Sequence, residues 1–259
     1  MIIKVINERK IGSLFHYAHF LYDCLFPEII CELYNYDTVI RKESLHQTIG
    51  NFSKIYNDVM QIKNLELSED DFNNYPANIL TYKPKEQLTE KIYFDKFRNF
   101  IFQRYGIISS EYNTLYPEIL LIKRHNTVNL IDNEVLKEQL KKDNRTLTSG
   151  SDRREIYNID LVEEHLKNKY SNFKSLFLEF ISFEEQVKYF NNAKLIILAH
   201  GAAMANMFFC KQGTTIIEVT CNTKAPFFNK ISNILKLNHI KHQINTPESI
   251  INCINEITL

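Results

Sequence analysis

The residues with the clearest chemical potential are His200 and Gly201, which follow a predicted buried strand at 195–199 and precede a predicted helix at 202–209. A strand that runs straight into a helix start points free N–H groups and the positive end of the helix dipole at one place, which suits a phosphate. Gly201 lets a ligand approach the backbone, and an imidazole can bond a phosphate oxygen. The alternative is an ordinary turn glycine, because one Gly is far weaker than a full glycine-rich fingerprint.

A second group of polar residues, His16, His19 and Asp23, shares one face of a helix predicted over residues 13–34. The opposite face carries an apolar stripe of Leu14, Ala18, Leu21, Leu25 and Ile29. Pro27 is expected to kink or break the helix beyond that polar face. The functional interpretation is a carboxylate that orients an imidazole, or is itself a base, at the mouth of a cleft. The alternative is a solvated face with an incidental His–Asp pair.

Further charged residues stand near predicted strand ends or helix starts. Arg124 follows a strand at 119–122, Arg154 lies near the start of a helix, and Glu218 nearly ends a strand at 215–219. Guanidinium groups match phosphate oxygens, so Arg124, Arg154 and His200 together would suit a diphosphate. Taken singly, each arginine fits a surface salt bridge better, and it is the placement of several at strand ends that favours a functional site.

The pattern of elements predicts an α/β protein. A first strand is expected at 2–6 and another at 36–40, whereas residues 41–116 suggest only helices and loops. From Ile119 onward, strands at 119–122, 176–180, 195–199, 215–219 and 240–244 alternate with helices, which implies a parallel sheet covered on both faces. Ligands bind beyond the carboxyl ends of the strands in such Rossmann-like sheets.

Composition restricts the function classes. The chain has 259 residues, 44% hydrophobic and 24% charged, with zero formal net charge, so no basic footprint argues for nucleic acid. Its five cysteines have no metal-site spacing, and reduced thiols are expected. Residues 1–10 carry no cleavable signal pattern and no apolar run reaches the ~18–20 residues of a membrane span, so we expect a cytoplasmic protein. The richness in Asn, Ile, Lys and Tyr suggests an AT-rich genome and, if viral, a place in the host cytoplasm or the virion.

Four sequence blocks, in order, resemble glycosyltransferase family 61. The block at 19–27 is similar to the family's GHxxxDxLP, and residues 122–124 to its ISR, with Lys123 in place of Ser. Residues 154–158 keep an Arg and an Asn (Asn158), with Ile159 in place of the usual acid; the alternative alignment through Asn133 and Glu134 would lose the Arg. The last block, His200, Gly201, Ala202, Asn206 and then Glu218, resembles HGAGLxN…GxxVIE, with Ala203 in place of Gly.

This resemblance implies a GT-B-like fold of two Rossmann-like halves. We expect a reduced N-terminal acceptor-side domain at 1–117 and a C-terminal nucleotide-sugar-binding domain at 118–259. It also implies an inverting transferase that moves a sugar from a nucleotide sugar, UDP-linked in many members, to a hydroxyl of a glycan or glycoprotein. The absence of a signal segment departs from the eukaryotic members, most of which work in the secretory pathway.

The expected mechanism is one in-line displacement. Asp23 is predicted to be the base and His19 its orienter or substitute. The donor-binding set comprises Arg124, Arg154, Asn158, His200, Gly201, Ala202, Asn206 and Glu218, with Glu218 assigned to a ribose or sugar hydroxyl. No DxD motif is present, so no cofactor is required, although Mn²⁺ or Mg²⁺ is permitted.

Two rival hypotheses remain open. One is a degenerate transferase that binds a nucleotide sugar or glycan without turnover, which Ala203 and Lys123 favour. The other is an unrelated Rossmann-like enzyme, such as a methyltransferase or a dinucleotide enzyme, although GxGxxG with a later acid is missing.

Overall fold

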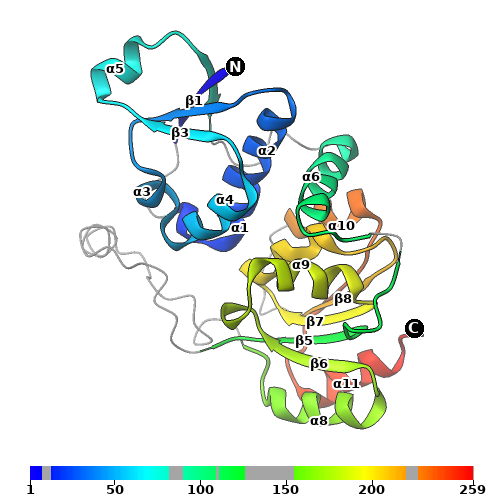
Figure 1. The fold of residues 1–259 in the computed structure, drawn as a ribbon. Helices are drawn as coiled ribbons and strands as arrows, with labels where there is room; N and C mark the ends of the chain where they lie inside the picture. The colour runs from blue at the N-terminus through cyan, green and yellow to red at the C-terminus, as the bar shows by residue number, and fades with distance from the viewer. Residues whose placement is uncertain (8–12, 82–89, 109–110, 126–154, 220–226, 259) are drawn as a thin grey trace, which may run out of the picture. The chain divides into compact units, whose positions relative to one another are not determined.

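We analysed a computed structural model of the chain, which describes residues 1–7, 13–81, 90–108, 111–125, 155–219 and 227–258 (Figure 1). Among these residues the chain forms two compact units, one within residues 1–104 and one from residue 105 onward. The roles of acceptor side and donor side that we assigned to the two halves stay predictions.

The first unit contains a four-stranded parallel sheet with the strand order β3-β2-β1-β4. Its strands are β1 (Ile2–Ile6), β2 (Thr38–Arg41), β3 (Lys63–Glu66) and β4 (Asn78–Thr81). The helices that follow β2 in this unit are α3 (Leu45–Ile49), η3 (Gly50–Phe52), α4 (Ser53–Val59), α5 (Glu69–Asn74) and α6 (Lys91–Arg104). The sequence did not indicate β3 or β4, because β3 is a largely exposed edge strand that lacks an apolar run.

The helical segment after β1 is built from four pieces rather than from one regular helix. They are the 3-10 turn η1 (Ser13–Phe15), α1 (Tyr17–His19), the π-helix η2 (Phe20–Leu25) and α2 (Phe26–Leu33). The predicted apolar stripe is confirmed, with Leu14, Leu21, Leu25 and Ile29 buried. Asp23 is buried as well, so the alternative interpretation of a solvated face does not hold for this residue. The i→i+5 pitch of a π-helix shifts the residues away from their α-helical positions and turns Asp23 inward.

The second unit contains a five-stranded parallel sheet with the strand order β6-β5-β7-β8-β9. The strands are β5 (Ile119–Lys123), β6 (Phe173–Phe177), β7 (Leu195–Ala199), β8 (Thr215–Val219) and β9 (Asn238–His242). The helices are α8 (Ile159–Lys169), η5 (Leu178–Phe180), α9 (Phe183–Asn192), η6 (Ala202–Phe209), α10 (Phe227–Leu235) and α11 (Pro247–Asn255). The predicted α/β fold class with parallel sheets and flanking helices is thus confirmed.

Helices cover both faces of this second sheet, with α8 and α11 on one side and α9 and α10 on the other (Figure 1). Alternate strand residues such as Leu121, Ile197 and Ile217 form one core with α8 and α11. β7 and β8 are buried along their whole length, as their continuous apolar sequence requires in a doubly covered sheet. A capping box formed by Ser182 and Glu185 begins α9.

Three local predictions for this unit need correction. Residues 178–180 form the 3-10 turn η5, and the strand predicted at 176–180 lies three residues earlier, at Phe173–Phe177. The helix whose start was predicted near Arg154 begins only at Ile159, after Asn158 in a left-handed conformation. The segment 202–209 is a 3-10 helix. Here the backbone turns override the periodicity read from the sequence.

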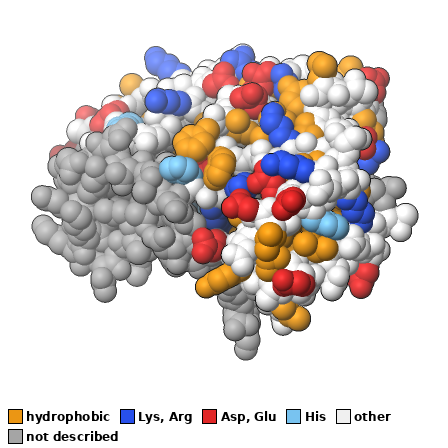
Figure 2. All heavy atoms as spheres, turned by 90° about the horizontal axis from the view of Figure 1, so that it is seen from below, with side chains coloured by type: hydrophobic (Ala, Val, Ile, Leu, Met, Phe, Trp, Pro, Cys, Tyr) orange, Lys and Arg blue, Asp and Glu red, His pale blue; other side chains and the backbone are white. Residues whose placement is uncertain are grey.

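No helix within the described ranges has the length and apolar character that a membrane crossing needs. On the face drawn in Figure 2, acidic and basic side chains are interspersed over the described residues, in keeping with the zero formal charge.

Candidate functional site

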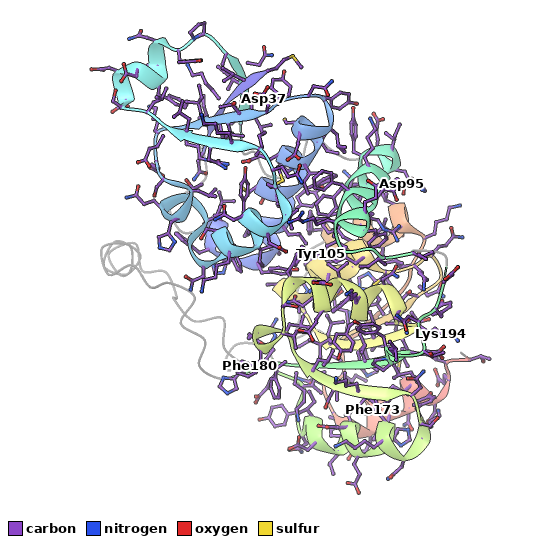
Figure 3. The ribbon with its side chains drawn as sticks, in the orientation of Figure 1. Asp37, Asp95, Tyr105, Phe173, Phe180 and Lys194 are labelled. Carbon is purple, nitrogen blue, oxygen red and sulfur yellow. The ribbon has the colours of Figure 1, made fainter. Side chains whose placement is uncertain are left out.

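The carboxyl edge of the second sheet gathers the predicted donor-binding residues. β5, β7 and β8 are adjacent and parallel, so Arg124, His200 and Glu218 lie together where these strands end. Figure 3 marks the two ends of the sheet, with Lys194 just before β7 at one end and Phe180 after β6 at the other. The predicted convergence of strand-end residues is therefore present for these three.

Arg124 packs directly onto the turn between β7 and η6. Its Nη2 donates a hydrogen bond of 3.0 Å to the carbonyl of His200. A Cβ on Gly201 would stand 1.7 Å from the same Nη2, so only glycine leaves room for the guanidinium. Gly201 also has φ +156° and ψ −159°, a conformation that is essentially restricted to glycine. Gly201 is therefore required for the arginine to lie against the turn.

The 3-10 helix η6 begins directly after this glycine. The first internal bond runs from the N–H of Met204 to the carbonyl of Gly201 at 3.0 Å, so the N–H groups of Ala202 and Ala203 have no acceptor within the helix. Both alanines are half-buried rather than enclosed. The turn therefore brings together the N–H groups of Ala202 and Ala203, the imidazole of His200 and the guanidinium of Arg124. Each of these groups favours an anion.

Glu218 contacts the imidazole of His200 and has no exposed surface. One carboxylate oxygen, Oε1, accepts a hydrogen bond from Nδ1 of His200, and Oε2 accepts one of 2.7 Å from Nε2 of His239. Burial alone would raise the pKa of this carboxyl group, but the hydrogen bonds and charges of the two histidines outweigh it and lower the pKa to about 2. Glu218 is thus an ionised acceptor whose two oxygens are both engaged. Direct contact with a ribose or sugar hydroxyl, as we expected, does not fit this geometry.

Asn206 is also fully enclosed, with 0% of its surface exposed. Its Nδ2 donates 3.2 Å to Oε1 of Gln186 in α9, and Nε2 of Gln186 donates 3.0 Å to the carbonyl of Leu178. This amide pair ties η6 to α9 and to the turn after β6. Asn206 therefore holds the backbone of the site in place, which corrects its prediction as a ligand contact.

Two further residues of the family blocks, Lys123 and Asn158, lie at the end of β5 and at the start of α8. Lys123, which replaces Ser, bonds Asp160 at 3.0 Å and Glu163 at 2.8 Å, so its ammonium group holds β5 to α8. Asn158 is exposed at the start of α8, with φ +46° and no capping bond from its side chain. Arg154 lies outside the described residues, and its predicted role stays a prediction.

Two features of this edge were not indicated by the sequence. His239 lies at the end of the relay from His200 through Glu218, and a β-strand with alternating polar residues carries no signal for that contact. His125, Phe177 and Phe180 form an aromatic cluster with ring centroids 5.0–6.0 Å apart, and Phe180 is 64% exposed. Only the position of His125 next to Arg124 could have drawn attention to the cluster.

In the first unit, His19 and Asp23 form the predicted pair. Nδ1 of His19 lies 2.9 Å from Oδ2 of Asp23, whose side chain is 3% exposed while that of His19 is 45% exposed. The helical segment follows β1 and so begins at the carboxyl edge of its own sheet. Burial and the charge of Asp23 raise the pKa of the neighbouring Tyr22 to about 12. A buried carboxylate is thus connected to solvent through a half-exposed imidazole.

A buried ionic network lies one turn further along this segment. Nη2 of Arg41 bonds both oxygens of Glu28 at 2.8 and 2.7 Å, and the hydroxyl of Tyr56 donates 2.5 Å to Glu28 Oε2. All three side chains are enclosed. The network fixes α2, and with it the adjoining π-helix, against β2 and α4.

Among the described side chains, no group of three or more His, Cys, Asp or Glu could hold a metal ion. Whether Mn²⁺ or Mg²⁺ takes part stays an open prediction.

Among solved structures, 17 chains match, including the E. coli heptosyltransferase WaaC with ADP, which is 11% identical over 99% of this chain and 97% of that chain, with a TM-score of 0.33. No curated protein matches the chain. The family model described as Glycosyltransferase 61 matches residues 17–217, well over half of the sequence, and this range includes His19, Asp23, Arg124 and His200. The chain therefore belongs to glycosyltransferase family 61.

Proposed function

We propose that this protein transfers a sugar from a UDP-linked donor to a hydroxyl of a glycan or glycoprotein acceptor, with inversion at the anomeric carbon. The observation that carries the proposal is the packing of Arg124 against His200 and Gly201 at the start of η6. A guanidinium, an imidazole and two N–H donors lie close together there, and their preference for an anion supports recognition of a diphosphate.

In the proposed reaction, an acceptor oxygen attacks the anomeric carbon from the face opposite to the leaving group. The bond between that carbon and the phosphate oxygen breaks, and the nucleoside diphosphate leaves with the electron pair. Arg124, His200 and the N–H groups of Ala202 and Ala203 would stabilise the negative charge that develops on the phosphate. No covalent intermediate is needed in a single displacement, so inversion follows.

The acceptor hydroxyl must lose its proton in the same step. We assign the base to Asp23, with His19 as its orienter, because the two side chains are in contact and the imidazole reaches solvent. The exposed Phe180 and its neighbour His125 supply the kind of flat apolar surface on which a nucleobase or a sugar ring stacks.

The test is transfer and hydrolysis with a panel of nucleotide sugars, comparing wild type with Arg124→Ala. Removing one hydrogen-bond donor that stabilises the negative charge of the leaving diphosphate is expected to lower kcat by about 10²–10³-fold. Arg104→Ala is the matched control, since Arg104 is a half-exposed arginine whose ionic contact, with Asp58, is long at 3.8 Å. Binding of a donor without turnover for any acceptor would contradict the proposal and favour a degenerate binding protein.

A further inference from the structure

His239 belongs to a buried chain of polar contacts that begins at the proposed donor site. Its Nε2 bonds Glu218 at 2.7 Å, and its Nδ1 lies 3.3 Å from the hydroxyl oxygen of Ser232 in α10. Ser232 in turn donates 2.9 Å to the carbonyl of Asn229. The side chains of His239 and Glu218 are 5% and 0% exposed, so this chain of contacts is sealed from solvent.

The bonding of Glu218 determines the orientation of His200. An ionised carboxylate can only accept, so both histidine nitrogens that face it must carry protons. Nδ1–H of His200 is therefore directed at Glu218, and Nε2 remains for a ligand. Among the described residues, Nε2 of His200 has no hydrogen-bond partner, and the flanking ring of Phe228 at 5.7 Å offers none.

The hydrogen bond from His239 to Oε2 of Glu218 also helps to fix the imidazole of His200, because it holds the carboxylate in one orientation. If His239 did not occupy Oε2, the carboxylate could rotate or bind water, and the imidazole of His200 would lose its fixed partner. His239 lies beyond residue 217, where the family match ends, so its contribution follows from the geometry of this chain.

We propose that His239 and Ser232 are positioning residues for the donor site: through Glu218 they hold Nδ1–H of His200 inward and leave Nε2 to bond a phosphate oxygen. This rests on the proposed function. To donate to a phosphate, Nε2 must also carry a proton, so the bound His200 is an imidazolium between two anions, Glu218 and the diphosphate.

Two measurements test the proposal. Nitrogen-15 NMR of the histidine rings in the ligand-free protein is expected to show His200 protonated at Nδ1, and addition of UDP is expected to protonate Nε2 as well. The dissociation constant of UDP, measured by calorimetry, is expected to rise about tenfold or more in His239→Leu, the effect of losing one charge-assisted hydrogen bond in the relay.

The variants separate positioning from folding. His239→Gln keeps an N–H donor near Oε2 and is expected to restore UDP affinity to within a few-fold of wild type, whereas Ser232→Ala should show a smaller loss than His239→Leu. His242→Gln is the control: His242 is on the same strand, but it bonds Ser249 in α11 at 3.0 Å and should bind UDP normally.

The outcomes are distinguishable. A His200 ring without a preferred Nδ1–H form, or UDP affinity that His239→Leu leaves unchanged, would overturn this inference alone. If wild type bound no nucleoside diphosphate, the proposed function and this inference would both fail. If His239→Leu does not fold, the NMR state of wild-type His200 and the affinity of His239→Gln still decide the question.

Discussion

Replacing Glu218 by Gln tests how much the buried contacts of this carboxylate with His200 and His239 stabilise the second unit. The pKa of Glu218 is lowered from 4.5 to about 2, because the hydrogen bonds of His200 and His239 outweigh the effect of burial. Each pKa unit corresponds to about 1.36 kcal/mol, so the full shift is worth about 3 kcal/mol. Allowing for some solvent screening, we expect Glu218→Gln to lower the free energy of unfolding by about 2–3 kcal/mol at pH 7.

The pH dependence of this loss follows from the direction of the shift. Because the pKa in the folded protein lies below that in the unfolded chain, the stabilisation is complete above about pH 4.5 and is lost as the pH falls towards 2. Wild type and Glu218→Gln should therefore converge in stability on acidification.

The assay is urea unfolding at a series of pH values from 7 to 2.5. Two units can unfold in separate transitions, so the comparison uses the transition that the substitution moves. Glu184→Gln is the matched control, because Glu184 is an exposed carboxylate paired with Lys188, and it should cost less than about 1 kcal/mol. A difference between wild type and Glu218→Gln that stayed constant with pH would refute the reasoning.

Three further predictions concern the site and its support. Gly201→Ala should displace the guanidinium of Arg124, since the new Cβ would lie 1.7 Å from Nη2, and UDP affinity measured by calorimetry should fall about tenfold or more; an unchanged affinity would contradict the contact. Asp23→Asn should reduce transferase turnover by about 10²–10⁴-fold in a steady-state assay while donor binding persists, and near-full activity would remove Asp23 as the base. Tyr56→Phe deletes a hydrogen bond to the buried carboxylate of Glu28 and should cost about 1.5–3 kcal/mol in chemical unfolding; a neutral result would show that the carboxylate finds another donor.

The sequence predicted the second sheet well because its central strands are continuous apolar runs. β7 and β8 are buried on both faces, and Ser182 with Glu185 marks the start of α9 by a local hydrogen-bonding pattern. Such signals are contained within a few neighbouring residues. The turn of His200 and Gly201 was visible for the same reason, since the residue types and the break between strand and helix are adjacent in the sequence.

What the sequence did not reveal depends on contacts between distant residues or on irregular backbone. Glu218 and His239 are 21 positions apart, and only the pairing of β8 with β9 brings them together. The π-helix that buries Asp23 leaves no signature in an apolar periodicity read at α-helical spacing. The exposed strand β3 lacks the apolar run by which strands are recognised.

The central claim is that the turn at His200 and Gly201 binds the diphosphate of the donor. A crystal structure of the protein with UDP tests it most directly. We expect phosphate oxygens within hydrogen-bonding distance of the guanidinium of Arg124, of Nε2 of His200 and of the N–H groups at the start of η6. A nucleotide bound elsewhere on the chain, with Arg124 and His200 making no contact to phosphate, would contradict it.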